Sequence, residues 1–373
     1  MSKFGVYVHF PFCRAKCPYC DFYSRPMRDI DEAQWLDAYR KSLKKHSAAT
    51  SGKTVSSIFF GGGTPSLASP EFIGAIIQTV RDLWQTADDA EISLEGNPDS
   101  LTADKMRGYR DAGVNRLSVG VQSLNDRELR FLGRLHDARK ALETLETARG
   151  VFGNLSADFI YALPEQSLKD WESALKEILS LDLPHLSLYQ LALEEDSFFY
   201  KKRNVVLPDD DTAAALFEMT TNAAAQKGYT RYEVSNLAKD GFECRHNLLY
   251  WTGGEYAGIG AGAGGRYEKD GVFYATKDVP DARLWLQTRQ TEIETLTAAE
   301  RAEELLLTGL RLKKGVSRAA FKSVIGRDLD DFLDLTALER LCAENLMRDD
   351  GESIRATRSG VLVLNSLITA LSA

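Results

Sequence analysis

The chain has 373 residues, of which 44% are hydrophobic and 27% charged, and its formal net charge is −8. This acidic balance lacks the basic surface that a nucleic-acid partner requires, so we exclude nucleic acid as a partner. No apolar run approaches the ~20 residues that a membrane span needs, and the N-terminus shows no signal-peptide pattern. The sequence therefore predicts a cytoplasmic protein that is not transmembrane, with one large domain and a smaller one.

Three of the five cysteines lie in one short stretch with the spacing C-x3-C-x2-C: Cys13, Cys17 and Cys20. Thiolates this close repel one another unless a cation holds them, which indicates a metal ion or an iron–sulfur cluster. The alternative is a zinc site completed by His9 or Asp21, although zinc ligands usually come as paired C-x2-C sets. We therefore favour a [4Fe–4S] cluster held by three thiolates, which leaves one iron open to a small molecule.

Short β-rich runs alternate with amphipathic helical patterns through the first half of the chain. We expect strands over residues 6–10, 56–60, 91–95, 116–120, 155–160 and 185–191. We expect helices over residues 32–45 after a cap at Asp31, from Pro70, after a cap at Thr102, and over 167–181. Six consecutive strand–helix units imply parallel strands with right-handed crossovers. The sequence thus predicts an α/β fold, a partial (β/α)6 barrel, with ligands at the carboxyl ends of its strands.

Chemically distinctive residues follow several of these strands. The run 61–65 (Gly-Gly-Gly-Thr-Pro) follows the second strand. Such glycines either form a tight turn or let backbone N–H groups approach an anion closely. Glu95 ends the third strand and Asp158 lies in the fifth. Each carboxylate either pairs with a structural cation, which for Glu95 would be Arg116, or accepts hydrogen bonds from a ligand.

Beyond residue 200 the strand–helix alternation becomes less regular. We expect a helix over 209–227, a short strand over 229–234, a loop-rich block at 244–251 and a glycine-dense run at 258–265. From residue 297, helical patterns with a hairpin near 346–356 predict a winged-helix-like module, whose many acidic residues argue against DNA. The expected divisions are a barrel at 1–205, a barrel-completing segment at 206–290 and the C-terminal module at 291–373.

One histidine stands out in the loop-rich block. His246 lies beside Asn247, Tyr250 and Trp251. A lone histidine in a loop is usually just solvated, but a free imidazole among aromatic neighbours is also a candidate axial ligand for haem iron. Cys244, two residues earlier, is a second candidate.

The cysteine spacing, the Gly-Gly-Gly-Thr-Pro run and Glu95 with the following Asn97-Pro98 together resemble the radical S-adenosylmethionine (SAM) superfamily. Further motifs lie at residues 7–13 (Tyr-Val-His-Phe-Pro-Phe-Cys), 120–123 (Gly-Val-Gln-Ser), 133–136 (Gly-Arg-Leu-His) and 158–164. These motifs are similar to oxygen-independent coproporphyrinogen III oxidase and to its relatives, the haem chaperones of the HemW family. The resemblance extends over essentially the whole chain.

The resemblance implies a set of cofactor-binding residues. Cys13, Cys17 and Cys20 would ligate three irons of a [4Fe–4S] cluster, and the fourth iron would chelate SAM. The positions that match SAM-contacting residues of the superfamily are Tyr7, Gly62 and Glu95. The positions that match a second SAM site of the oxidase are Tyr19, Gly63, Thr64, Gln122, Arg134 and Asp158. Such a cluster implies an electron donor of the flavodoxin or ferredoxin type, and no catalytic side chain is assigned.

Two positions separate the chaperone from the oxidase within this resemblance. The oxidase carries another cysteine two residues after the triad, where this chain has Phe22. The chaperone carries a His-Asn-x-x-Tyr-Trp motif, present here at residues 246–251. The resemblance therefore implies a haem chaperone that passes haem to an acceptor protein. The alternatives are coproporphyrinogen III decarboxylation and a metal-binding module without radical chemistry. Relatives often carry a histidine where this chain has Gly264.

Overall fold

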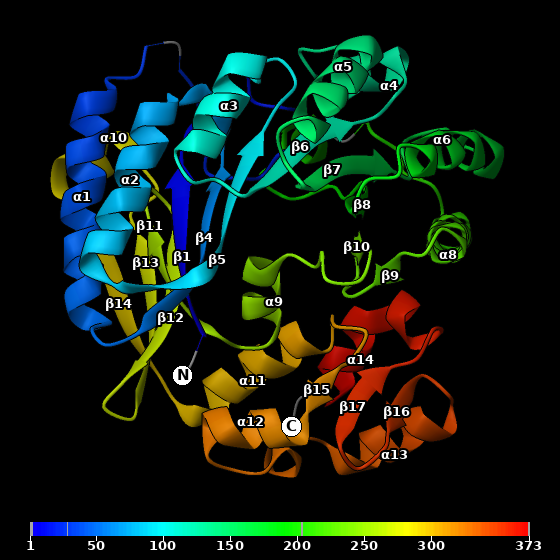
Figure 1. Ribbon diagram of the computed structural model, residues 1–373. Coiled ribbons are helices and arrows are strands. Elements are labelled where there is room, and N and C mark those ends of the chain that lie inside the picture. Colours follow the sequence, from blue (N-terminus) through cyan, green and yellow to red (C-terminus); the bar gives the residue numbers. More distant parts are fainter. Residues whose placement is uncertain (1–2, 28, 203, 372–373) are drawn as a thin grey trace.

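One sheet of twelve strands organises most of the chain in the computed structural model, which describes residues 3–27, 29–202 and 204–371 (Figure 1). Its strand order is β14-β13-β12-β11-β1-β4-β5-β6-β7-β8-β10-β9. Neighbours from β11 through β8 pair in parallel, and the pairs toward both edges are antiparallel. The expected α/β fold, with a run of six parallel strands taken in chain order, is confirmed.

The six parallel strands form the wall on which the site is built. They are β1 (Lys3–Phe10), β4 (Thr54–Gly62), β5 (Gln85–Gly96), β6 (Arg116–Gln122), β7 (Asn154–Tyr161) and β8 (His185–Gln190). Apolar residues such as Val6, Ile58 and Leu117 are fully buried, because helices cover the outer face of the parallel strands.

Helices lie along the outside of this sheet (Figure 1). They are α1 (Glu32–Ala49), α2 (Pro70–Leu83), α3 (Ala103–Asp111), α4 (Asp126–Phe131), α5 (Ala138–Arg149), α6 (Leu168–Ser180), α7 (Phe198–Lys202) and α8 (Asp210–Gln226). Side chains of Asp31, Ser69 and Thr102 accept backbone N–H groups at the starts of α1, α2 and α3. The caps expected at Asp31 and Thr102 and the start of α2 at Pro70 are therefore confirmed.

The block 244–251 is a helix, so the prediction of a loop there was wrong. Helix α9 (Arg245–Trp251) begins after Cys244, whose side chain makes no capping hydrogen bond. Instead, the carboxylate of Glu91 on β5 accepts the N–H groups of Arg245 at 3.0 Å and of His246 at 3.2 Å. The cap comes from a strand more than 150 residues away, so the local sequence contains no sign of it. The strand expected over 229–234 is limited to β9 (Thr230–Arg231), which pairs with β10 (Asn236–Ala238).

The glycine-dense run joins two neighbouring strands whose backbones approach each other closely. These are β11 (Glu255–Ile259), parallel to β1, and β12 (Gly264–Lys269), which continues into β13 (Val272–Asp278) and β14 (Thr291–Leu296). A Cβ on Gly258 would lie 1.9 Å from the carbonyl oxygen of Gly264, and one on Gly260 would lie 2.3 Å from that of His9. The glycines therefore permit close backbone packing. The antiparallel extension β12–β14 was not foreseen from the sequence.

The C-terminal part has a hydrophobic core of its own, formed by residues between Ala302 and Leu371. Its helices are α11 (Ala298–Gly309), α12 (Arg318–Ile325), α13 (Leu335–Ala343) and α14 (Leu364–Leu371). They pack with a three-stranded sheet of β15 (Val316–Ser317), β17 (Ser353–Ala356) and β16 (Met347–Asp349). The expected helical module with a hairpin is confirmed, and the exact domain boundaries stay a prediction.

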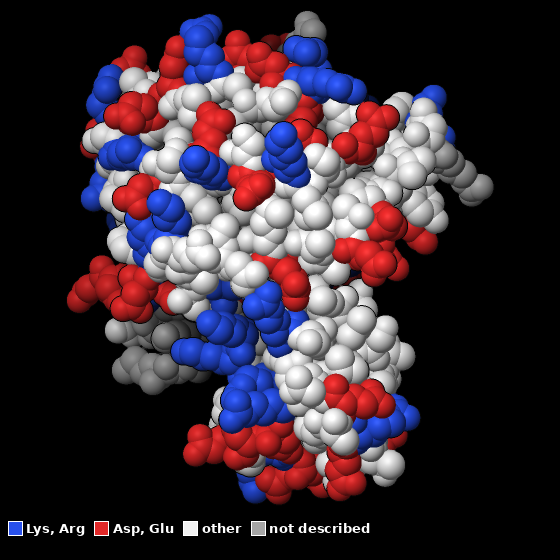
Figure 2. All heavy atoms as spheres, turned by 90° about the vertical axis from the view of Figure 1, so that its right-hand side faces the viewer, with Lys and Arg blue, Asp and Glu red and all other residues white. Residues whose placement is uncertain are grey.

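On the face shown in Figure 2, acidic and basic side chains are interspersed over the barrel. Lys and Arg side chains gather where the barrel narrows toward the C-terminal module. In the described parts of the chain, no helix combines the length and apolar character that crossing a membrane requires.

Two stacked tryptophans pack strands β11–β13 against helix α1. Trp35 on α1 stacks on Trp285 of α10 (Ala282–Thr288), with ring centroids 5.6 Å apart and planes 10° apart. The indole N–H of fully buried Trp285 donates to Asp278 at 2.7 Å. Asp278 also accepts the N–H of Gly260 at 3.1 Å. This contact thus holds the β11–β13 extension against the N-terminal half of the barrel.

We expect Trp285→Ala to lower the free energy of unfolding by about 3–5 kcal/mol, because it leaves a large cavity and removes a partner of a buried carboxylate. Urea unfolding followed by fluorescence measures the loss. The matched control, Leu284→Ala on the exposed side of α10, is expected to change stability by less than about 1 kcal/mol. An equal loss in both variants would contradict this role for the tryptophan pair.

Candidate functional site

The three clustered cysteines line one cavity, which we call the thiol cavity, of about 330 Å³ at the carboxyl ends of the parallel strands. The loop that carries them leaves β1 through β2 (Phe12–Cys13) and returns through β3 (Arg25–Pro26), which pairs with β2. Cys13 is buried, whereas Cys17 and Cys20 are partly exposed. Burial raises the pKa of the Cys20 thiol to about 11, and the charges of the other two cysteines add to the effect. An uncompensated thiolate is costly here, so the site favours a bound cation.

The glycine run holds β4 directly against the cysteine loop. The N–H groups of Gly63 and Thr64 donate to the carbonyl oxygens of Phe10 and Phe12, both at 2.7 Å. A Cβ on Gly63 would lie 2.5 Å from the Phe12 oxygen, so a side chain is excluded there. Gly62 has φ of 102°, in the left-handed region, and a Cβ on it would lie 2.5 Å from an imidazole carbon of His9. As a result of this close packing, the wall of the thiol cavity includes Gly62, Gly63 and Thr64.

Arg134 connects the thiols to the neighbouring strand ends. Its guanidinium contacts the Cys17 sulfur and the Tyr19 hydroxyl, each at 3.4 Å, and donates to Asn97 Oδ1 at 2.7 Å and to the Gly120 carbonyl at 2.9 Å. A cation at this distance stabilises a thiolate. Gln122 also faces the thiol cavity and has φ of 71°, where a register shift interrupts the β6–β7 pairing.

Two half-buried carboxyl groups, Glu95 and Asp158, form the inner border of the thiol cavity. Burial raises the pKa of Glu95 to about 8, and the charge of Asp158 raises it further, while a hydrogen bond from the Gly62 backbone opposes the shift. Burial also raises the pKa of Asp158, although hydrogen bonds from Ser187 and Ser118 counteract it. Near neutral pH, Glu95 therefore carries a proton that it can donate in a hydrogen bond.

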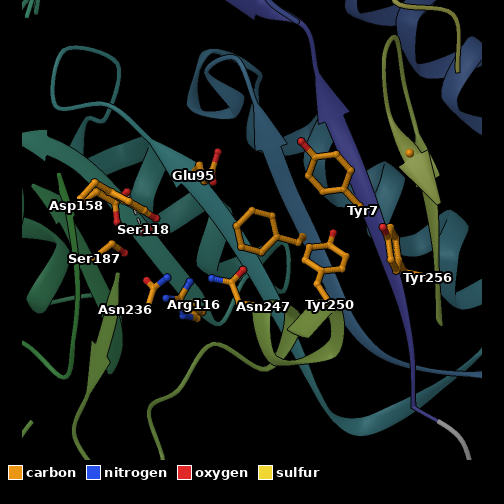
Figure 3. A pocket seen from close by; sticks show the side chains of 13 residues that line it. Tyr7, Glu95, Arg116, Ser118, Asp158, Ser187, Asn236, Asn247, Tyr250 and Tyr256 are labelled. Carbon is orange, nitrogen blue, oxygen red and sulfur yellow. Dashed lines mark hydrogen bonds between the residues drawn. The ribbon is translucent and has the colours of Figure 1, made fainter. Parts of the chain in front are cut away.

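A second cavity of about 350 Å³ lies deeper in the barrel, and we call it the Arg116 cavity (Figure 3). It shares Glu95, Ser118, Asp158 and Tyr189 with the thiol cavity. The structure thus gathers eleven of the thirteen predicted site residues around the thiol cavity and leaves out Tyr7 and His246. Tyr7 lines the Arg116 cavity, and its hydroxyl lies 2.9 Å from His9 Nδ1.

His246 does not lie in a loop and is not exposed. It is fully buried in α9, with Nδ1 at 2.8 Å from the Ser57 hydroxyl and Nε2 at 2.5 Å from the Tyr250 hydroxyl. Burial lowers the pKa of His246 to about 3, so the ring is neutral. Both ring nitrogens are engaged, and this arrangement offers neither one to haem iron. Cys244 is also fully buried, and burial raises the pKa of its thiol to about 12.

The donor set suits an iron–sulfur cluster better than a zinc ion. His9 cannot complete a zinc site in this conformation, because its ring nitrogens contact the Tyr7 hydroxyl and the Tyr23 carbonyl. Among the described residues, no three His, Cys, Asp or Glu side chains are gathered tightly enough to hold one metal ion. A cluster binds each thiolate through a different iron, so three thiols around one cavity fit it without converging on a point.

Sequence reasoning missed Asn97 and Ser118 as site residues. Asn97 accepts from Arg134 and donates to Thr64 Oγ1 at 3.2 Å, and Ser118 donates to Asp158 at 3.1 Å. Their positions were the available signal, because Asn97 follows the end of one parallel strand and Ser118 lies in the next.

Comparison with known proteins defines the class first. A family model described as the radical SAM superfamily matches residues 7–178, and one described as the HemN C-terminal domain matches residues 296–363. The solved structure of coproporphyrinogen III oxidase (HemN) from Escherichia coli shares the fold, with a TM-score of 0.82 at 23% identity over 99% of this chain and 90% of that one. The barrel with its three-cysteine loop is thus a radical SAM fold.

Individual relatives narrow the assignment to one family within the radical SAM superfamily. Heme chaperone HemW of Escherichia coli K12 is 35% identical over 99% of this chain and 98% of its own. Heme chaperone HemW of Bacillus subtilis is 34% identical over 98% of each chain. A mitochondrial radical S-adenosyl methionine domain-containing protein 1 from Bos taurus is 35% identical over 99% of this chain and 87% of its own. The chain belongs to the HemW family of radical SAM proteins, as its motifs predict.

The raised pKa of Glu95 gives a test of the half-buried carboxyl pair. An unfolded glutamate ionises near pH 4.5 and the folded one near pH 8, so the folded state binds more protons between these values. Stability should therefore fall as pH rises from about 5 to 8, by up to about 1.4 kcal/mol per pH unit from this group. In Glu95→Gln that contribution disappears, and urea midpoints across pH measure it. Glu177→Gln, at an exposed position on α6, should keep the wild-type profile; a parallel profile for Glu95→Gln would contradict the assignment.

The contacts of His246 give a second test. We expect His246→Ala to lower the free energy of unfolding by about 2–4 kcal/mol, because it leaves the Ser57 and Tyr250 hydroxyls unpaired and opens a buried cavity. The number of haem molecules bound per chain should not change. Thermal unfolding and haem titration measure the two effects, with Thr252→Ala, exposed at the end of α9, as control. A lost haem absorption band in a stable His246→Ala protein would instead restore the axial-ligand hypothesis.

Proposed function

We propose that the protein is a haem chaperone that carries a [4Fe–4S] cluster with SAM, binds haem and passes it to an acceptor protein. The observation that carries this proposal is the full-length similarity to several proteins named Heme chaperone HemW, at 33–35% identity in the examples from Escherichia coli, Haemophilus influenzae and Bacillus subtilis. The similarity includes both the barrel and the C-terminal module, so the proposal concerns the chain as a whole.

The thiol cavity would hold the cluster and SAM. Cys13, Cys17 and Cys20 would ligate three irons, with Arg134 beside Cys17 offsetting negative charge. When bound and reduced, the cluster supplies the electron that cleaves SAM to a 5′-deoxyadenosyl radical. Glu95 and Gly62 line the same cavity, and protonated Glu95 would donate a hydrogen bond to SAM. Tyr7 would position SAM from the Arg116 cavity, next to Glu95.

The positions that match a second SAM site of the oxidase also line the thiol cavity. We propose that a second SAM, if it is bound, contacts residues of the same wall that match the oxidase positions: Tyr19, Gly63, Thr64, Gln122, Arg134 and Asp158. An electron donor of the flavodoxin or ferredoxin type would reduce the cluster in the cytoplasm.

Phe22 favours transport of haem over oxidation of a precursor. It lines the rim of the thiol cavity with 56% of its surface exposed and stands where the oxidase carries a cysteine. Phe22 cannot act as a thiol in a radical reaction.

The decisive experiment is anaerobic reconstitution with iron and sulfide, followed by haem titration and an assay for 5′-deoxyadenosine on the same sample. We expect bound iron and sulfide and about one haem per chain. Cys17→Ala should lower the bound iron and sulfide, whereas Cys342→Ala, in the C-terminal module, should not. Zinc without sulfide would favour a non-radical metal module, and turnover of coproporphyrinogen III would favour the oxidase; either result rejects the proposal.

A further inference from the structure

The Arg116 cavity contains a buried cation that the radical SAM site does not use. Arg116 is the first residue of β6, so it lies at the end of the barrel opposite the cysteine loop. Figure 3 shows its guanidinium between Asn236 and Asn247 on one side of the cavity, with Glu95 and Asp158 on the other. The cavity therefore has a cationic and amide-bearing side facing a carboxyl-bearing side.

The guanidinium of Arg116 is buried and has no hydrogen-bond partner among the described residues. Only 2% of the residue is exposed, and among the described residues it makes no ion pair or side-chain hydrogen bond; its Nε is unsatisfied. Asn236 beside it is 4% exposed, and its Oδ1 is also unsatisfied. Burying a guanidinium without a hydrogen-bonded anion is costly. Arg116 Nε is thus a buried donor without an acceptor, and Asn236 Oδ1 is a buried acceptor without a donor.

The charges of the nearby carboxyl groups Glu91 and Asp158 favour the Arg116 cation, but neither group forms an ion pair or hydrogen bond with it. The oxygens of Glu91 accept the N–H groups of Arg245 and His246 at the start of α9. Asp158 accepts from Ser118 and borders the thiol cavity, as does Glu95. Burial raises the pKa of both border carboxyl groups, which reduces the negative charge that an entering anion would meet.

Much of the remaining cavity wall is aromatic. The rings of Tyr7, Phe59, Tyr250 and Tyr256 form part of it, and Figure 3 shows these three tyrosines on the side away from Asp158. The hydroxyls of Tyr7 and Tyr250 are engaged by His9 and His246, so mainly their ring surfaces are available to a ligand. Such walls suit a flat apolar body.

We propose that the Arg116 cavity binds a carboxylate-bearing ring compound, with the carboxylate on the Arg116 guanidinium and Asn247 and the ring against the tyrosines. This inference rests on the proposed function, under which the ligand is a tetrapyrrole and the carboxylate one of its propionates. Two planar N–H groups match the two oxygens of a carboxylate, which makes arginine a specific receptor for it.

Gly264 allows the cavity to be filled without disturbing Arg116. It lines the cavity, and a Cβ on it would meet only the Thr276 carbonyl oxygen, at an ordinary contact distance of 3.6 Å. A large side chain at this position therefore has space, and that space belongs to the proposed ligand. Gly264→Phe should block the site, whereas Gly264→Ala should leave it open.

The test compares two probes, haem and haem dimethyl ester, whose propionates are blocked. With the full-length reconstituted protein we expect haem to bind about tenfold or more tightly than the ester, because a charge-assisted hydrogen bond is lost with the ester. Arg116→Gln should reduce that preference to less than about threefold, and Arg110→Gln, at an exposed site on α3, should retain it. Gly264→Phe should weaken haem binding relative to Gly264→Ala.

Equal affinity for haem and its ester in the wild type would overturn the inference and leave the chaperone proposal intact. An undiminished preference in folded Arg116→Gln would also overturn it. If Arg116→Gln does not fold, the inference is tested by the affinities of the wild type for haem and its ester and by haem binding to Gly264→Phe and Gly264→Ala. If the protein binds no haem, the chaperone proposal fails, and coproporphyrin III becomes the probe. Binding of coproporphyrin III to the wild type that is lost in Gly264→Phe would support the Arg116 cavity as a binding site without the chaperone function. If coproporphyrin III does not bind either, both the site and the chaperone proposal are rejected.

Discussion

The close approach of two backbone segments at one end of the barrel, residues 10–12 and 63–64, is the constraint on which the rest of the site depends. Gly63 and Thr64 on the β4 side donate to carbonyl oxygens of Phe10 and Phe12, and only glycine fits at position 63. This contact fixes where the cysteine loop leaves the sheet. The thiols, the glycine backbone and Glu95 consequently line the same cavity, although they come from different strands.

Two arginines divide the barrel interior between them. Arg134 lies beside the thiols, where its two terminal nitrogens contact Cys17, Asn97 and the Gly120 carbonyl. Arg116 lies at the other end, and its guanidinium makes no hydrogen bond to the other described residues. The half-buried carboxyl groups of Glu95 and Asp158 lie on the shared border of the two cavities. A proton on Glu95 lowers the negative charge of that border, so ligands on both sides can carry carboxylates of their own.

Local sequence patterns were sufficient to predict elements that depend on neighbouring residues and elements that belong to the repeated strand–helix unit. The caps at Asp31 and Thr102 and the six parallel strands follow from signals within a few residues, and the three closely spaced cysteines line one cavity. The environment of His246 could not be foreseen in this way. Its helix is capped by Glu91 and its ring is held by Ser57, both distant in sequence. Strand β12 was missed because it begins with the last two glycines of the glycine-dense run, which has the composition of a loop.

The cap that Glu91 provides for α9 also constrains how the chain assembles. The two partners are separated by 154 residues, so α9 gains its first hydrogen-bonded turn only after β5 is in place and the later chain has been synthesised. Until then the Glu91 carboxylate stays hydrated. Asn247 and Tyr250 of α9 cannot yet complete the wall of the Arg116 cavity. The wall of the Arg116 cavity is therefore complete only once α9 has docked against β5.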